Sequence, residues 1–164
     1  MILGILSDTH DHLRRVEQAM QVFEQRHVEH ILFAGDMVSP FVIDVYARSK
    51  IPVTAVYGNN EGEKVFISQK FHTIGKIYDA ACSLELDGKS IFMCHYDWIA
   101  QSLIKNSSYD IIIYGHTHHI DIREISGRWL INPGEACGLL TGRATVVILD
   151  TTSMKPELID LPEL

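Results

Sequence analysis

The sequence predicts a mixed α/β fold of layered sheets and helices, built as a single domain over residues 1–164. Five short, continuously apolar runs suit strands that are covered on both faces. An amphipathic helix pattern lies between the first two runs, which is typical of a β-α-β crossover. Two hairpin signals in the second half add antiparallel strands. A chain of 164 residues, 46% of them hydrophobic, can bury a core of its own.

The elements follow in order along the chain. The five apolar runs cover residues 2–6, 31–34, 53–57, 91–94 and 111–114. Residues 11–26 place Leu13, Val16, Met20 and Phe23 on one helical face. A second helix is expected over 40–48, with Ser39 as its N-cap, and a third over 97–105.

The remaining segments read as hairpins and a final strand. Residues 82–86 and 90–94 flank Asp87-Gly88, and residues 120–125 and 128–131 flank Ser126-Gly127. A last strand is expected over 144–150. The segment 61–64 reads as a loop and the segment 157–164 as a tail without a functional assignment.

Composition and charge indicate which partners and which cellular compartment to expect. The net charge is −7 and the longest basic cluster is Arg14-Arg15, so a nucleic-acid partner is not expected. No apolar stretch reaches the roughly 18 residues of a membrane span. The first residues show neither a basic segment nor a cleavage site, and three widely spaced cysteines suit buried free thiols. These features predict a cytoplasmic protein.

Polar residues that can bind metal follow each of the five apolar runs. They are Asp8 and His10, then Asp36, Asn59, His95, and finally His116 with His118. Since the carboxyl ends of parallel strands meet at one edge of a sheet, these side chains are expected to share one cleft. Oxygen and nitrogen donors without thiolate favour Mn, Ni, Fe or Zn, or more weakly Mg, over a cysteine-rich zinc site.

Glycines precede several of these donors. Gly35, Gly58 and Gly115 stand immediately before Asp36, Asn59 and His116. A residue without a Cβ permits a sharp turn and a close backbone approach. A lone histidine or Gly-Asp pair after a strand is usually a capping group or a turn, but seven donors at five strand ends favour a metal site.

In this order the motifs resemble the calcineurin-like metallophosphoesterase superfamily. The matching segments are Ser7-Asp8-Thr9-His10, Gly35-Asp36, Gly58-Asn59-Asn60-Glu61, His95 and Gly115-His116-Thr117-His118. Residues 7–12, 57–61 and 114–118, together with Asn132-Pro133-Gly134-Glu135, are similar to its small prokaryotic phosphodiesterase branch. The Asn132 segment reads equally well as a tight turn or as support for the cleft.

The resemblance implies a two-layer mixed β-sandwich flanked by helices and a site for two divalent ions, with Mn as the first expectation. One ion would be held by Asp8, His10, Asp36 and His118, and the other by Asp36, Asn59, His95 and His116. Asp36, Asn59 and His95 are assigned to catalysis together with a hydroxide that bridges the ions. The implied activity is hydrolysis of a small phosphodiester, and a homodimer or a homotetramer is an open option.

The chain departs from the family pattern after Asn59. Larger phosphomonoesterases of the superfamily carry a histidine where this chain has Asn60. An amide cannot act as a general acid, so His119 or Glu61 would have to protonate the leaving oxygen, or the leaving group must be good. This favours a diester. Glu61 is alternatively expected to orient a metal-binding histidine.

Two other functions are weighed against the enzyme. A scaffold protein is one alternative, because a eukaryotic retromer subunit resembles the same fold with a degraded site. The intact donor residues argue against it, namely His10, Asn59, His95, His116 and His118. A nuclease is the other alternative, which the acidic chain disfavours because it has no added DNA-binding segment.

Overall fold

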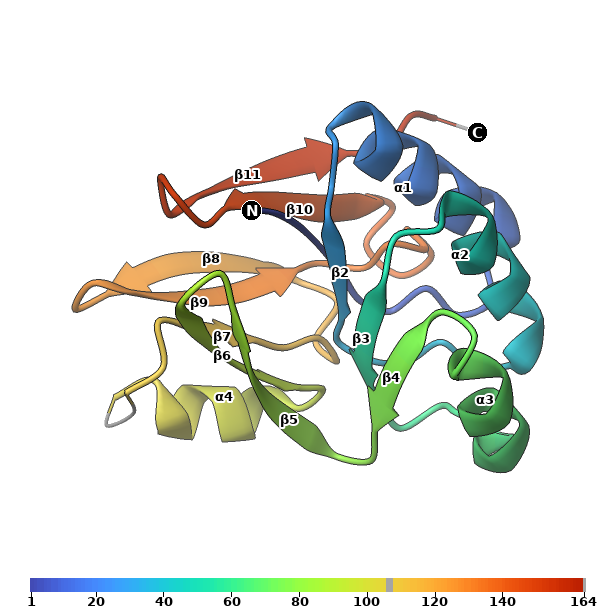
Figure 1. The fold of residues 1–164 in the computed structure, drawn as a ribbon, viewed down its shortest axis with the longest axis horizontal. Helices are drawn as coiled ribbons and strands as arrows, with labels where there is room; N and C mark the ends of the chain where they lie inside the picture. Colours follow the sequence, from blue (N-terminus) through green and yellow to red (C-terminus); the bar gives the residue numbers. More distant parts are fainter. Residues whose placement is uncertain (106–107, 164) are drawn as a thin grey trace.

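The computed structural model describes residues 1–105 and 108–163 of the chain, which form two mixed sheets packed face to face (Figure 1). The strand order of the first sheet is β11 (Lys155–Asp160), β10 (Thr145–Asp150), β1 (Ile2–Leu6), β2 (His30–Phe33), β3 (Val53–Val56), β4 (Gly75–Tyr78). The order of the second sheet is β5 (Ala81–Leu86), β6 (Lys89–Cys94), β7 (Ile111–Ile113), β9 (Arg128–Pro133), β8 (Ile120–Ile125).

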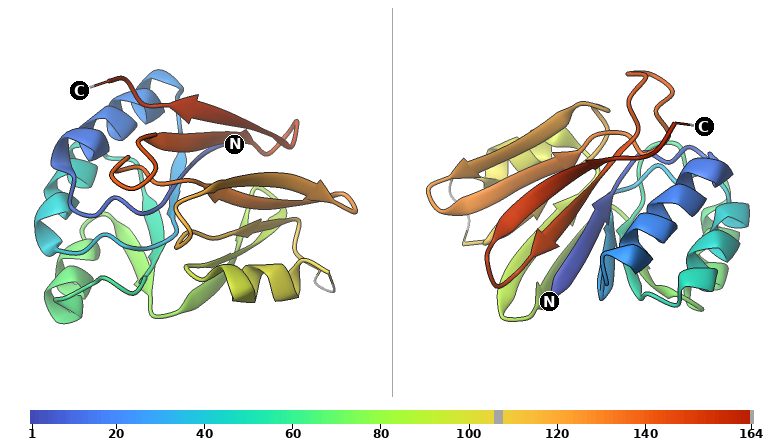
Figure 2. Two further views of the ribbon diagram at one scale, coloured as in Figure 1. Left: turned by 180° about the vertical axis from the view of Figure 1, so that it is seen from behind. Right: turned by 90° about the horizontal axis from the view of Figure 1, so that it is seen from above.

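Helices cover the outer faces of both sheets (Figure 2). The helices of the described residues are α1 (Leu13–Gln25), the 3₁₀ turn η1 (Pro40–Val42), α2 (Ile43–Ser49), α3 (Lys64–Phe71) and α4 (Asp97–Leu103). The first three α-helices pack on the first sheet, and α4 packs on the second. Within 1–105 and 108–163, no helix combines the length and apolar character needed to cross a bilayer.

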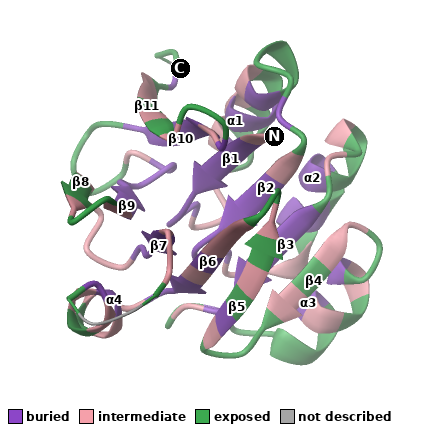
Figure 3. Cartoon of the chain, turned by 60° about the vertical axis from the view of Figure 1, so that its left-hand side comes forward, coloured by how far each residue is buried: buried purple, intermediate pink, exposed green. Residues whose placement is uncertain are grey.

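The alternation of side chains along the strands builds three apolar layers. In β2, Ile31 and Phe33 face the helices α1 to α3, whereas Leu32 faces the second sheet. In β7, Ile111 faces the first sheet and Ile112 faces α4. Because both faces of these strands are covered, their sequences are continuously apolar. Figure 3 shows the central strands β1 and β2 as buried.

Most elements expected from the sequence are present. The five apolar runs are strands to within one or two residues, and the two hairpins turn at the predicted dipeptides. Asp87-Gly88 and Ser126-Gly127 all have positive φ, the conformation that a tight two-residue hairpin turn requires. The expected β-sandwich flanked by helices is therefore confirmed, and the three cysteines are free and buried.

Some expectations were wrong or incomplete. Ser39 occupies the N-cap position before Pro40 as expected, but its side chain makes no capping hydrogen bond and the helix opens as a 3₁₀ turn. Helix α3 was not predicted, because Val65 and Phe66 lie exposed on it and leave no clear apolar stripe. The strand β4 was not predicted either. The supposed tail contains most of β11, an edge strand that accommodates Pro156. Leu164 lies outside the described residues.

Helix α1 is held against β1 by Phe23. The Phe23 ring is fully buried, and a Cβ placed on Gly4 would lie only 2.9 Å from it. Glycine at that position therefore makes room for the ring. Since α1 follows directly on the segment that carries Asp8 and His10, this contact also helps to hold that segment in place.

We expect Phe23→Ala to lower the free energy of unfolding by about 3–5 kcal/mol, because it removes a buried ring and leaves a cavity. The matched control is Phe66→Ala, because Phe66 is 61% exposed. Its free energy of unfolding should stay within about 0.5 kcal/mol of the wild-type value. Urea denaturation followed by circular dichroism measures both. Equal losses for the two variants would contradict this account of the α1 contact.

Candidate metal centre

The topology brings the seven predicted metal ligands to one edge of the sandwich. In the first sheet β1, β2 and β3 are parallel, and in the second sheet β6, β7 and β9 are parallel. The loops that follow these strands contact one another. The Gly115 N–H donates to the His95 carbonyl at 3.0 Å, and the Ala136 N–H donates to the Ser7 carbonyl at 2.9 Å. Residues up to 110 positions apart are thereby placed side by side.

A first cluster consists of Asp8, His10, Asp36 and His118, whose potential ligand atoms lie within 4.8 Å of one another. His118 Nε2 is 3.5 Å from Asp8 Oδ1, and His10 Nε2 is 3.6 Å from Asp36 Oδ2 and 3.9 Å from Asp8 Oδ1. Two donors that each lie about 2.1 Å from an ion can be at most about 4.2 Å apart. These three separations meet that limit.

A second cluster lies on the other side of Asp36. The Asn59 Oδ1 atom is 3.0 Å from His95 Nε2 and 2.9 Å from His116 Nδ1. His95 Nε2 is also 3.5 Å from Asp36 Oδ2. Carboxylate, amide oxygen and two imidazoles therefore converge here as well, and Asp36 Oδ2 faces both clusters.

The carboxylates are held so that one oxygen points inward. Asp36 Oδ1 accepts the backbone N–H groups of Asn59 and Asn60, both at 2.9 Å. Asp8 Oδ2 accepts from the Ser7 hydroxyl at 2.6 Å and from the His116 N–H at 3.2 Å. The second oxygen of each carboxylate thus faces the interior of the site, where Asp36 Oδ2 also accepts the Asn60 side-chain amide at 2.7 Å.

Two histidines are oriented in the same way. His95 Nδ1 is 2.8 Å from the Ala34 carbonyl oxygen, and His118 Nδ1 is 2.7 Å from Glu135 Oε2. A hydrogen bond at Nδ1 fixes the ring and leaves Nε2 as the free donor atom, which is the usual arrangement of metal-binding histidines. In both residues that Nε2 points into the cluster.

Glu135 was not among the predicted site residues, yet it supports the site directly. It is fully buried, and besides His118 it accepts hydrogen bonds from the N–H groups of Leu140 and Thr141. Gly134 precedes Glu135 just as glycines precede Asp36, Asn59 and His116. That repeated spacing was the available signal. It was missed because the parallel pairing of β9 with β7 was not expected.

The Asn132 segment acts both as a turn and as support. Asn132 Oδ1 accepts the Gly134 N–H at 2.9 Å, which closes the turn. The Asn132 amide donates to the Gly115 carbonyl at 2.9 Å and to the Thr117 hydroxyl at 3.0 Å. The segment therefore holds the loop between His116 and His118, and both alternatives for it are realised.

The three proposed proton donors or orienting residues occupy different places. Asn60 donates from its side chain to Asp36 Oδ2 at 2.7 Å, so it orients that carboxylate. Glu61 was expected to orient a histidine, but its two oxygens accept the Met37 and Gly58 N–H groups at 2.9 and 2.8 Å. It ties two loops together instead. His119 is exposed beside His118 at the rim.

Five of the predicted ligands adopt a left-handed backbone conformation. They are Asp8, His10, Asp36, His116 and His118, with φ between 42° and 66°. Such a conformation costs a non-glycine residue roughly 1–2 kcal/mol. It persists because the surrounding hydrogen bonds impose it, for example from the Asp8 N–H to the Gly35 carbonyl at 2.9 Å. Backbone strain of this kind concentrates at functional sites.

The electrostatics of the site favour a cation. Burial raises the pKa of Asp8, and the Ser7 hydroxyl offsets this only in part. Burial also opposes ionisation of Asp36 and Glu135, but hydrogen bonds from His95 and Asn60 lower the pKa of Asp36, and those from His118 and Thr141 lower the pKa of Glu135 to about 2. Buried carboxylates in close proximity require compensating positive charge.

Two atoms of the first cluster provide a direct test of whether a metal ion fits. Within the described part of the chain, Asp8 Oδ1 and His10 Nε2 are buried side-chain atoms without a hydrogen-bond partner. A buried polar atom left unpaired costs about 1–3 kcal/mol. Both face the cluster and both are donors that a divalent transition metal accepts. The residues present therefore fit a metal ion.

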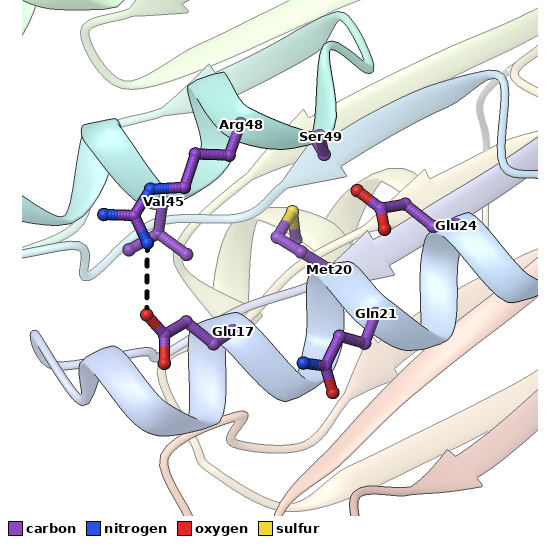
Figure 4. Close-up of a pocket in the computed structure, with 7 residues that line it drawn as sticks. All are labelled: Glu17, Met20, Gln21, Glu24, Val45, Arg48 and Ser49. Carbon is purple, nitrogen blue, oxygen red and sulfur yellow. Dashed lines mark hydrogen bonds and ion pairs between the residues drawn. The ribbon is translucent and has the colours of Figure 1, made fainter.

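The first cluster adjoins a surface depression that is separate from the pocket on the helical face of the molecule. His10, Asn60 and His118 share a depression with Leu139 and Leu140. The pocket in Figure 4 lies between α1 and α2 and contains none of the predicted ligands. It is crossed by an ion pair between Arg48 and Glu17 at 3.4 Å. We assign the chemistry to the polar edge of the sandwich.

Fold and site together define a metal-binding α/β protein of the phosphoesterase type, and comparison with known proteins agrees. The calcineurin-like phosphoesterase superfamily domain matches residues 1–154. A phosphodiesterase of Methanocaldococcus jannaschii is 40% identical over 155 residues, covering 92% of this chain and 93% of that protein. The chain therefore belongs to the calcineurin-like phosphoesterase superfamily, as the sequence motifs predicted.

Solved structures show the same fold. An archaeal phosphodiesterase superposes with a TM-score of 0.93 at 38% identity, covering 98% of this chain and 100% of that one. A phosphoesterase from E. coli superposes with a TM-score of 0.73 at 19% identity, covering 99% and 100%. At that lower identity the likeness concerns the fold alone.

We expect Glu135→Gln to weaken the binding of Mn²⁺ about 10- to 100-fold, because it removes the charge that orients His118. Titration calorimetry of metal-free protein measures the dissociation constant. Glu124→Gln is the matched control, since Glu124 is exposed on β8. Unchanged affinity in the Glu135 variant would contradict the supporting role.

Proposed function

We propose that the protein is a dinuclear metal-dependent phosphodiesterase that hydrolyses a small phosphodiester. The observation that carries the proposal is the placement of Asp36 Oδ2, which is 3.6 Å from His10 Nε2 and 3.5 Å from His95 Nε2. A carboxylate oxygen placed between two donor clusters suits a ligand shared by two ions. The phosphodiesterase relative at 40% identity supports the choice of reaction.

The residues divide into two ligand sets that share Asp36. One set is Asp8, His10, Asp36 and His118, and the other is Asp36, Asn59, His95 and His116. Two divalent ions, with Mn as the first choice, would supply an activated water at neutral pH and positive charge for the phosphoryl oxygens. The chain's own part is to position these donors so that they converge on either side of Asp36 Oδ2.

The surroundings of the site favour a diester over a monoester. Asn60 lies beside His10 and His118 in the surface depression, where a leaving oxygen would need a proton. Its amide already donates to Asp36 and cannot release a proton as an acid. Glu61 is occupied by two backbone N–H groups. A substrate whose leaving group departs without general-acid help is therefore the better match.

We expect Asp36→Asn to lower kcat/KM for bis-p-nitrophenyl phosphate by more than about 100-fold in the presence of Mn²⁺. The variant should also lose both ions, because Asp36 belongs to each ligand set. Turnover is followed by p-nitrophenolate absorbance, and bound metal is measured by plasma mass spectrometry.

Asp79→Asn serves as the matched control, because the Asp79 side chain is 89% exposed. It should match the wild type in turnover and metal content. If the wild type binds two ions per chain yet turns over no faster than Asp36→Asn, the enzyme proposal fails. The scaffold interpretation would then take its place.

We expect Asn60→His to raise kcat/KM for phenyl phosphate at least about tenfold more than for bis-p-nitrophenyl phosphate. A general acid assists poor leaving groups most and typically contributes about 10²–10⁴-fold. Asn60→Gln, which keeps an amide, is the control and should leave the ratio of the two rates unchanged. If Asn60→His also leaves this ratio unchanged, Asn60 does not explain the preference for a diester.

A further inference from the structure

A stacked aromatic pair, of which Tyr96 is half-buried and Trp98 is exposed, adjoins the second ligand cluster. Tyr96 and Trp98 stack on each other with ring centroids 4.3 Å apart and planes inclined by 27°. Both rings stand steeply against His116, at centroid distances of 5.1 and 5.8 Å. Trp98 is nevertheless 56% exposed. We call Tyr96 and Trp98 the aromatic shelf.

The aromatic shelf is anchored to the proposed metal centre. Tyr96 directly follows His95, and the two rings contact edge to face at 5.3 Å. Trp98 lies in the first turn of α4, which Ala100 and Ile104 fix against the second sheet. The shelf is therefore held in a set position relative to His116, whose ring nitrogen reaches Asn59 at 2.9 Å.

Core packing does not account for the exposure of Trp98. Tyr96 stacks on the indole, yet more than half of the residue remains open to solvent. An indole open to solvent beside a binding site is a surface on which a planar ring can stack. On the side of His10 and His118 the exposed large apolar residues are Leu139 and Leu140, so among the described residues the exposed indole lies on the other side of the centre.

The distance between Trp98 and the second ligand cluster limits which substituent of a bound phosphate could reach the aromatic shelf. The indole of Trp98 lies 5.8 Å from the ring of His116, a member of the second ligand set, so a phosphate bound by that set would not contact the indole directly. A planar group bonded to phosphorus through a linker, as a nucleobase is through a ribose, can bridge such a gap. A methyl or other short ester cannot.

We propose that Tyr96 and Trp98 bind the nucleobase of a nucleotide-type ester and make Trp98 a specificity-determining residue. The inference rests on the proposed phosphodiesterase function for the position of the phosphate. It goes further by assigning the substituent and the side chain that recognises it.

Binding of adenosine 5′-monophosphate and of ribose 5-phosphate to the Mn²⁺-loaded protein tests the proposal. Calorimetry gives both affinities, and the signal of the Trp98 indole N–H in NMR spectra reports the contact. Trp98→Ala should weaken binding of the adenosine nucleotide about 5- to 100-fold, the loss expected for one stacked base. It should leave the affinity for ribose 5-phosphate unchanged.

Two further variants make the result specific. Trp98→Phe keeps a ring and should retain most of the nucleotide affinity, whereas Phe66→Ala removes an exposed ring from α3 and should change nothing. Equal weakening of both ligands by Trp98→Ala, or no weakening of either, would overturn the assignment. Failure of the wild type to hydrolyse any diester would overturn the proposed function, while these binding data would still decide the role of the shelf.

Discussion

The placement of the Asp36 carboxylate is the constraint on which the site depends. One oxygen accepts two N–H groups from the loop after β3, which joins that loop to the end of β2. The other oxygen faces His10 on one side and His95 on the other. Gly58 is required because a Cβ there would lie 2.1 Å from Asp36 Oδ1. Backbone geometry and ligand geometry are therefore set by the same side chain.

The layers of the fold make such a strained edge tolerable. Loops with left-handed residues at Asp8, Asp36 and His116 oppose folding by several kcal/mol in total. The apolar contacts between the two sheets and between each sheet and its helices offset that cost. The strand ends are consequently rigid enough to hold buried donors such as Asp8 Oδ1 without a protein partner.

The polar edge holds the donor set together with the side chains that surround it. The donor set fits the superfamily to which the chain belongs. Asn60 places an amide against Asp36 Oδ2, and Trp98 and Leu140 place exposed apolar surface on different sides of the centre. Reactivity would follow from the donors, and the choice of substrate from these neighbouring side chains.

The sequence alone determined the five buried strands, the two predicted hairpins and the order of the metal donors, because burial on two faces and turn chemistry are local patterns. It did not reveal α3, β4 or β11, because many of their residues are exposed and their apolar patterns are weak. Glu135 and the true partners of Glu61 likewise emerged only from tertiary structure. Hydrogen bonds between strand ends depend on which strands are parallel, and that pairing is decided when the two sheets assemble.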